Sequence, residues 1–263
     1  MNLNKPPELD QHGTAVPGLL LLRRAASPMA LALLLAACSG GPERVPPRAP
    51  VLPDATQARP SAAATNEPAV GRYRLDPQDS MLRILVYRGG PMAQLGHNHV
   101  ISSRDLQGEV LRASAVEASG FELTVPVNSL VVDDNKERAQ EGEDFPLNVS
   151  EDSKAGTKAN MLRPTLLDGA VYPNVSIRST GLRGTPDAPV ATVAIRIKNQ
   201  TREMQVPLAV QTQADALIVQ GSLEIRQSDF GITPLSIAMG ALTVQDTVKI
   251  KFRLVARSLP KAP

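Results

Sequence analysis

Two histidines separated by one residue form the pattern in this chain with the clearest chemical potential. They occur in Gly96-His97-Asn98-His99-Val100. Alternate side chains of an extended segment point to the same face, so the imidazoles of His97 and His99 would lie side by side. Such a pair could share a metal ion, or donate hydrogen bonds to a quinone carbonyl or a phosphate. A tetrahedral zinc ion needs a third or fourth ligand. The only other histidine is His12, so an acidic residue such as Asp105 would have to complete a metal site.

Other short motifs do not indicate catalysis. The letters His-Asn-His occur in nucleases, but that active site is assembled from separated residues and needs a basic surface, whereas the net charge here is +2 over 263 residues. Asp229-Phe230-Gly231 matches a protein-kinase triplet, but the other kinase motifs are absent from the sequence, as is the Gly-x-Ser-x-Gly turn of serine hydrolases. The acidic clusters at 133–134 and 141–144 lack the ligand spacing of a calcium loop and are predicted to be solvated. We therefore expect a protein that is not an enzyme, requires no cofactor and binds no nucleic acid.

From Arg72 onward, the sequence alternates apolar and polar residues. This period of two is typical of antiparallel strands with one dry and one wet face. The clear strands lie in 121–127, 193–197, 204–210, 223–225 and 248–254, and weaker ones in 82–87, 106–111 and 175–179. They add up to eight or nine strands.

One helix interrupts the strands. Ser150 can cap it, with Glu151 and Asp152 near the positive end of the helix dipole. We expect it to end near Leu162, before Pro164. The polar connection 133–148 is predicted to be a loop or a short helix at one end of the sheet.

Eight antiparallel strands of this kind form either a sandwich or a closed barrel. Membrane barrels carry aromatic girdles and an apolar outer face. This chain has four Phe, three Tyr and no Trp, so we expect the apolar face to point inward. An eight-strand barrel has an interior that its own side chains just fill, or that holds one small ligand. The sequence leaves both possibilities open.

The N-terminal region has the layout of a bacterial export signal. Arg23-Arg24 precedes the apolar segment 29–35, which is shorter than the roughly 20 residues of a membrane span. Leu35-Ala36-Ala37-Cys38 matches the lipobox of bacterial lipoproteins, and Cys38 is the only cysteine. We predict a signal peptide over 1–37 and lipidation of Cys38, against the alternative of an ordinary signal followed by an unrelated cysteine. Ser39 favours anchoring in the outer membrane of a Gram-negative bacterium, facing the periplasm.

The residues after the signal divide into three parts. Residues 38–70 are rich in Pro and Ala and cannot bury enough apolar surface to fold, so they are predicted to be a disordered tether. Residues 71–257 form the folded domain, and residues 258–263 form a C-terminal tail.

Four segments of the folded part carry a family pattern. They are Tyr73-Arg-Leu-Asp76 followed by Ser80, residues 166–179 with Tyr172-Pro173, Arg-Gln-Ser-Asp-Phe-Gly-Ile at 226–232, and the closing strand 246–256. In these segments the chain resembles the YceI-like family of exported bacterial lipid-binding domains. The resemblance implies an all-β, lipocalin-like closed antiparallel barrel of about eight strands with one or two short helices. It also implies an isoprenoid or quinone-like lipid in the lumen. The chain differs from many members at Asp79-Ser80, where they have His-Ser.

We expect the lipid to be held by inward-facing apolar side chains, with the histidine pair at the lumen or its mouth. Phe230 is predicted to plug the barrel or to touch the lipid tail, and Gly231 to form a turn. The candidate ligand-binding residues are His97, His99, Phe121, Leu123, Val125, Ile195, Leu223, Ile225, Phe230, Ile250 and Phe252. The predicted function is non-catalytic binding, storage or transport of a long-chain amphiphilic lipid at the cell envelope. The alternatives are a metal or electron-transfer accessory protein using His97 and His99, and a structural envelope module with a solid core.

Overall fold

The computed structural model describes residues 70–260. The predicted signal peptide 1–37, the lipidation site Cys38 and all of the tether except its last residue lie outside the described residues, as do 261–263 of the tail. Among the described residues, no helix is long and apolar enough to cross a membrane.

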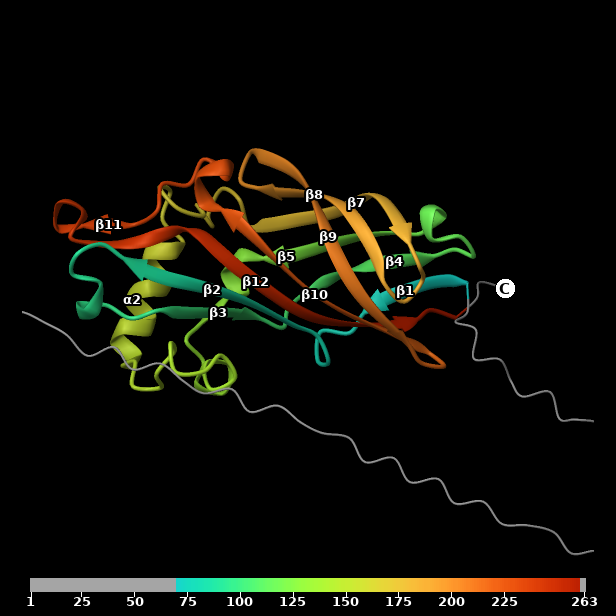
Figure 1. The fold of residues 1–263 in the computed structure, drawn as a ribbon, viewed down its shortest axis with the longest axis horizontal. Coiled ribbons are helices and arrows are strands. Elements are labelled where there is room, and N and C mark those ends of the chain that lie inside the picture. Colours follow the sequence, from blue (N-terminus) through green and yellow to red (C-terminus); the bar gives the residue numbers. More distant parts are fainter. Residues whose placement is uncertain (1–69, 261–263) are drawn as a thin grey trace, which may run out of the picture. The chain divides into compact units, whose positions relative to one another are not determined.

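The described residues form mainly antiparallel strands (Figure 1). The strands are β1 (Gly71–Leu75), β2 (Met81–Gly89), β3 (His99–Ser103), β4 (Gln107–Arg112), β5 (Gly120–Pro126), β6 (Val131–Val132), β7 (Asn174–Gly184), β8 (Pro189–Ile197), β9 (Gln200–Thr212), β10 (Ala216–Arg226), β11 (Ser236–Ile237) and β12 (Leu242–Ser258). All the segments that alternation predicted as strands lie within these elements to within one residue at each end, and the weak segments correspond to β2, β4 and β7.

Eight strands close into a barrel, as predicted. They are hydrogen-bonded in the order β1-β4-β5-β7-β8-β9-β10-β12, and β12 pairs with β1 to complete the ring. The 17-residue β12 is long enough to pair with β1 near its end and with β2 over its middle. From β2 the sheet continues through β3 to β6, so the barrel is extended on one side at one end.

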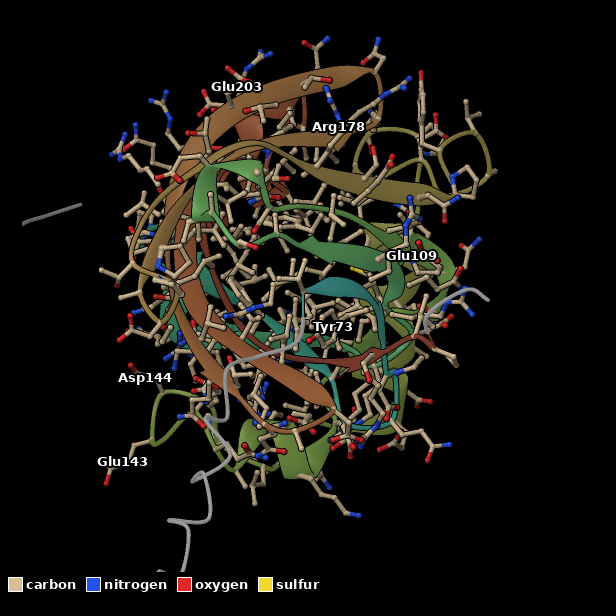
Figure 2. The ribbon with its side chains drawn as sticks, turned by 90° about the vertical axis from the view of Figure 1, so that its right-hand side faces the viewer. Tyr73, Glu109, Glu143, Asp144, Arg178 and Glu203 are labelled. Atoms are coloured by element: carbon tan, nitrogen blue, oxygen red, sulfur yellow. The ribbon has the colours of Figure 1, made fainter. Side chains whose placement is uncertain are left out.

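The alternation of side chains sets the inside and outside of the barrel. Figure 2 looks along the barrel, with Tyr73 inside the ring and Glu109, Arg178 and Glu203 on its outside. Tyr73 is buried, whereas Arg178 and Glu203 are exposed. Two clusters of buried aliphatic residues line the inner faces of the strands. Because Val, Ile and Leu supply most of this surface, the barrel buries a core with few aromatic rings.

The helix α2 (Glu151–Met161) begins and ends where the sequence predicts. The Ser150 hydroxyl accepts a hydrogen bond from the backbone N–H of Ser153 at 3.2 Å and caps the helix. A second helix, α1 (Asn135–Arg138), is capped in the same way by Asp134. The connection 133–148 therefore contains the short helix that was one of its two predicted forms.

The prediction that the acidic clusters are solvated is wrong for part of this connection. Asp133, Glu137 and Glu141 bury their side chains. Glu137 is paired with Arg83 at 2.6 Å and Arg104 at 3.2 Å, and Glu141 with Lys251. These cations belong to strands or loops distant in sequence, so a run of charges that resembles a solvated loop becomes buried once the barrel forms.

Candidate functional site

The interior of the barrel contains a cavity of about 400 Å³. It is therefore not the solid core that one sequence alternative described. Volumes of about 300–1,000 Å³ are typical of small-molecule sites. Ten of the eleven predicted ligand-binding residues line this cavity: His99, Phe121, Leu123, Val125, Ile195, Leu223, Ile225, Phe230, Ile250 and Phe252. His97 does not line it and instead lies on a second pocket beside the start of α2.

The wall of the cavity is almost entirely aliphatic. Within the described part of the chain, its aromatic residues are Phe121, Phe230 and Phe252, and Arg112 is its one Lys, Arg, Asp or Glu. Apart from Gln227, the polar residues form two groups. The first group lies near the short 3-10 helix η2 (Val116–Ala118) and consists of Arg112, Ser114 and Ser119. The second group consists of His99 on β3 and of Thr157 and Asn160 on α2. An apolar chain would meet few hydrogen-bonding groups between these two regions.

Phe230 and Gly231 of the motif at 226–232 form the end of a short helix and the turn that follows it. Phe230 ends the 3-10 helix η4 (Gln227–Phe230), is almost fully buried and faces the cavity. Gly231 follows it with φ of +69°, a left-handed conformation that glycine adopts without strain. The turn directs the Phe230 ring into the barrel.

Gly221 is a contributor that the sequence reasoning missed. It pairs with Phe252 across β10 and β12. A Cβ atom at position 221 would lie 2.6 Å from Cζ of the Phe252 ring. The absence of a side chain at Gly221 thus makes room for one of the three rings on the cavity wall. An isolated glycine inside a strand pattern is the sequence signal for such a close approach.

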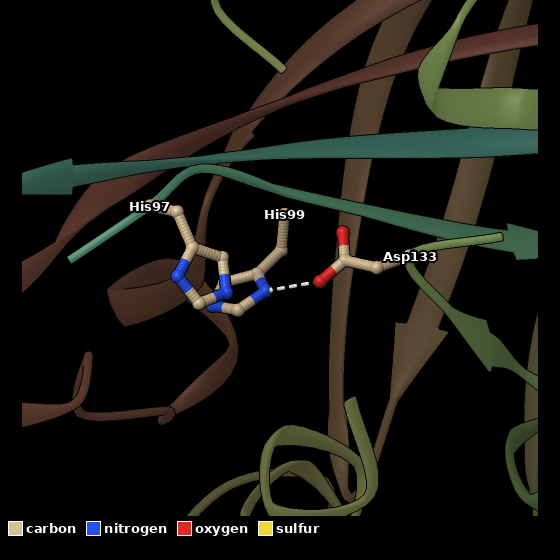
Figure 3. A group of neighbouring side chains, drawn as sticks. All are labelled: His97, His99 and Asp133. Carbon is tan, nitrogen blue, oxygen red and sulfur yellow. Dashed lines mark hydrogen bonds and ion pairs between the residues drawn. The ribbon is translucent and has the colours of Figure 1, made fainter. Parts of the chain in front are cut away.

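His99 lines the cavity, and His97 lies beside it (Figure 3). His99 is the first residue of β3, and His97 lies two residues before it. Their ring centroids are 4.5 Å apart with an interplanar angle of 64°, so the two imidazoles are adjacent, as their spacing predicted. The Nε2 atom of His97 is buried and has no hydrogen-bond partner within residues 70–260.

The acidic partner of this pair is Asp133, not Asp105. Asp105 is exposed, whereas Asp133 is fully buried and its Oδ2 lies 2.7 Å from Nδ1 of His99 (Figure 3). Asp133 is 34 residues from His99 and adopts a φ of +55°, which is unfavourable for a residue with a Cβ. The backbone N–H of Asp133 donates to the carbonyl of Val100 at 2.8 Å, which fixes this conformation beside β3.

The second oxygen of Asp133 is held by the protein. Its Oδ1 accepts hydrogen bonds from the Val100 backbone N–H at 2.8 Å and from Arg138 Nη1. Arg138 is itself fully buried and also donates to the carbonyl oxygens of Asn98 and Pro146, each at 2.7 Å. Asp133 is therefore fixed in position, and the ion pair compensates both buried charges.

The electrostatics of the group follow from this arrangement. Burial, and then the neighbouring His99, lower the pKa of the His97 imidazole. Burial acts to raise the pKa of Asp133, but the hydrogen bonds from His99 and Val100 and the charge of Arg138 outweigh it, so the net pKa is lowered. Asp133 is thus an ionised acceptor at neutral pH. The Nδ1 of a neutral His99 then carries the hydrogen, which leaves its Nε2 as an acceptor.

Known proteins are similar to this chain over the barrel. Residues 73–256 match the family model of the YceI-like domain, while no curated protein matches the sequence. Among solved structures, Burkholderia cenocepacia BcnA has a TM-score of 0.52 and 17% identity, over 69% of this chain and 98% of its own. A polyisoprenoid binding domain from Saccharophagus degradans, implicated in plant cell wall breakdown, has a TM-score of 0.48 and 15% identity, over 71% of this chain and 98% of its own. Because the family match covers most of the chain, this protein belongs to the YceI-like family.

Proposed function

We propose that this protein binds the apolar tail of an isoprenoid or quinone-like lipid inside the barrel, and that it stores, carries or shields that lipid without catalysis. The observation that supports the proposal is the aliphatic cavity of about 400 Å³ at the centre of the fold. The family resemblance implies the same class of ligand.

The size of the cavity favours an occupant. An empty apolar cavity destabilises a protein by about 24 cal/mol per Å³. A lumen of about 400 Å³ therefore leaves many aliphatic wall atoms without packing partners on one side. Water would fill the cavity poorly, because few polar groups line it. A branched apolar chain would restore the missing contacts and gain about 25 cal/mol for each Å² removed from water.

The net free energy of binding would be smaller than this gain from burial. A floppy chain loses conformational freedom when it is bound. The polar residues at the two regions described above would meet the less apolar parts of a ligand. His99, with an Nε2 acceptor and Asp133 behind it, is the candidate for contact with a head group.

Attachment at the cell envelope is the second part of the proposal. It is supported by the lipobox ending at Cys38 and the Pro-rich and Ala-rich segment that follows it. Several acyl chains on Cys38 would anchor the protein far more firmly than one chain, at about 0.8 kcal/mol per buried methylene. Intact mass measurement after expression in a Gram-negative host tests this. A mature chain that begins at Cys38 and carries acyl groups supports the anchor, and an unmodified Cys38 contradicts it.

The lipid itself is tested by extraction of the purified full-length protein with organic solvent, followed by mass spectrometry. We expect a stoichiometric isoprenoid or quinone. Two matched variants on β10 locate it: Leu223→Glu places a charge on the cavity wall, whereas Ser222→Glu places it on the exposed face opposite Lys251. The first should lose the lipid and the second should keep it. An empty extract from folded protein, or equal retention by both variants, contradicts binding in the cavity.

A further inference from the structure

We propose that His97, His99 and Asp133 bind one divalent transition-metal ion of the zinc class. The site shares His99 with the cavity wall and adds His97, which lies outside that wall, and the buried Asp133. Among the described residues, these three are the His, Cys, Asp and Glu side chains whose ligand atoms lie close enough together to hold one metal ion.

The ligand atoms are close enough for a single ion. One ligand atom from each residue lies within 4.8 Å of the other two. Zinc binds imidazole nitrogen at about 2.0–2.1 Å and carboxylate oxygen at about 2.0–2.2 Å, so two ligands of a tetrahedral ion are roughly 3.4 Å apart. In the metal-free protein, Nδ1 of His99 and Oδ2 of Asp133 share a hydrogen bond of 2.7 Å. Binding of an ion through these two atoms would release that hydrogen as a proton and move the two atoms slightly apart. Side-chain rotations of His97, two residues before β3, and of His99 would bring the three ligands to one ion.

The structure also contains a polar atom without a partner at this place. The Nε2 of His97 is buried and has no hydrogen-bond partner among the residues that the structure describes, whereas buried polar atoms are nearly always satisfied. The ring of His97 packs edge-on against that of His99, which holds the nitrogen atoms of both rings close together. Two neutral imidazoles with available lone pairs are the form that binds a metal ion.

The carboxylate is held by other residues, as metal ligands usually are. Its Oδ1 is occupied by the Val100 amide and Arg138, and its Oδ2 faces the histidines. Such outer contacts orient a ligand and strengthen a site. The charge of Arg138 opposes a second cation nearby, but its guanidinium is directed to Oδ1 and to the Asn98 and Pro146 carbonyls.

The composition of the site selects the class of metal. Two imidazoles and one carboxylate are suited to zinc and its transition-metal neighbours, and not to calcium or magnesium, which prefer oxygen ligands. Three protein ligands leave a fourth position for water or another small ligand. His97 borders the second pocket, with Asn148, Ser150 and Ser153, so an ion can reach the site without crossing the lipid cavity.

The test uses full-length protein without a histidine tag, stripped of metal with a chelator. Calorimetric titration with Zn²⁺ measures stoichiometry and affinity, and the visible absorption of added Co²⁺ reports the ligand geometry. We expect one ion per chain, and at least about a tenfold loss of affinity in both His97→Ala and His99→Ala. Asp133→Asn should also weaken binding, but the conclusion does not depend on this buried position.

The controls use Asp105, an exposed acidic residue near the pair in the sequence, and Cys38, the cysteine of the chain. Asp105→Asn and Cys38→Ser should bind as the unaltered protein does. Absence of Zn²⁺ and Co²⁺ binding in the unaltered protein would overturn the proposal, as would unchanged affinity in folded His97→Ala or loss of binding in either control. Because the lipid is measured by extraction and the metal by titration, failure of one proposal is distinguishable from failure of the other.

Discussion

Replacing Asp133 with Asn should destabilise the protein strongly. The substitution keeps the size of the side chain but removes the charge that compensates the fully buried Arg138. It also replaces an oxygen that accepts from the Val100 amide or from His99. Breaking one side of a buried ion pair costs about 3–5 kcal/mol. For a domain of this length, each kcal/mol lowers Tm by about 2–4 °C, so the expected loss is roughly 6–20 °C.

The matched control is Asp134→Asn, the same chemical change one residue later. Asp134 accepts from the backbone N–H groups of Lys136 and Glu137 at 2.9 and 3.2 Å to cap α1. Asn caps helices about as well as Asp, so this variant should lose less than about 1 kcal/mol. Urea unfolding followed by circular dichroism is the assay, because the chain has no Trp for fluorescence. Equal losses in the two variants would refute the role assigned to the buried pair.

The pH dependence of the free energy of unfolding tests the ion pair of Asp133 and Arg138 independently. The pKa of Asp133 is lowered in the folded protein, so the stability it contributes is present above its unfolded pKa of about 3.9 and is lost as pH falls through its folded pKa. The difference in free energy of unfolding between the unaltered protein and Asp133→Asn should therefore become smaller at acidic pH. Adding Arg138→Met to Asp133→Asn removes the unpaired charge and should recover part of the stability.

Three further predictions address other parts of the molecule. Because the pKa of His97 is lowered below 6.5 on folding, the free energy of unfolding should decrease as pH falls from about 6.5 to the folded pKa and then level off. Urea unfolding between pH 5 and 8 should show this decrease, and His97→Ala should remove it. Gly108→Ala should cost at least about 2 kcal/mol, because the residue has a φ of +146° and its Cβ would lie 2.2 Å from the Glu122 carbonyl oxygen. Gly156→Ala, in the interior of α2 where a Cβ meets no other atom, should instead stabilise the protein by up to about 1 kcal/mol. Equal changes in the free energy of unfolding for the two glycine variants would contradict this prediction. Solvent removal of the lipid from the cavity of about 400 Å³ should lower Tm, and adding the lipid back should restore it; an unchanged Tm would indicate that the cavity was not occupied.

The sequence predicted the barrel because strand patterning is local. Alternation identified β5, β8, β9, β10 and β12, since each of these strands has one buried and one exposed face. Ser150 and the acidic residues after it located α2, because helix capping depends on a few neighbouring residues. The same alternation assigned eight of the candidate residues to the inner face, where they line the cavity.

The polar site could be predicted only in part. The spacing of His97 and His99 placed their rings together, but the sequence offered only a nearby candidate, Asp105, for the acidic partner. The partner is Asp133, which reaches the pair because β6, just before it, hydrogen-bonds to β3. Nothing in the local sequence distinguishes Asp133 from a solvated acidic residue, since its neutralising Arg138 becomes a buried partner only when α1 folds against β3.

The amino-acid sequence by itself determined the strands, the capped helix, the inward direction of the apolar side chains and the neighbouring histidines. These features depend on the periodicity and on interactions between residues close in the chain. The tertiary structure alone decided that the barrel contains a cavity, that Gly221 admits the Phe252 ring, and that Asp133 and Arg138 are buried beside His99. The reason is that cavity volume and charge compensation are sums over strands and loops that lie far apart in the sequence, and they are fixed only when the ring of strands closes.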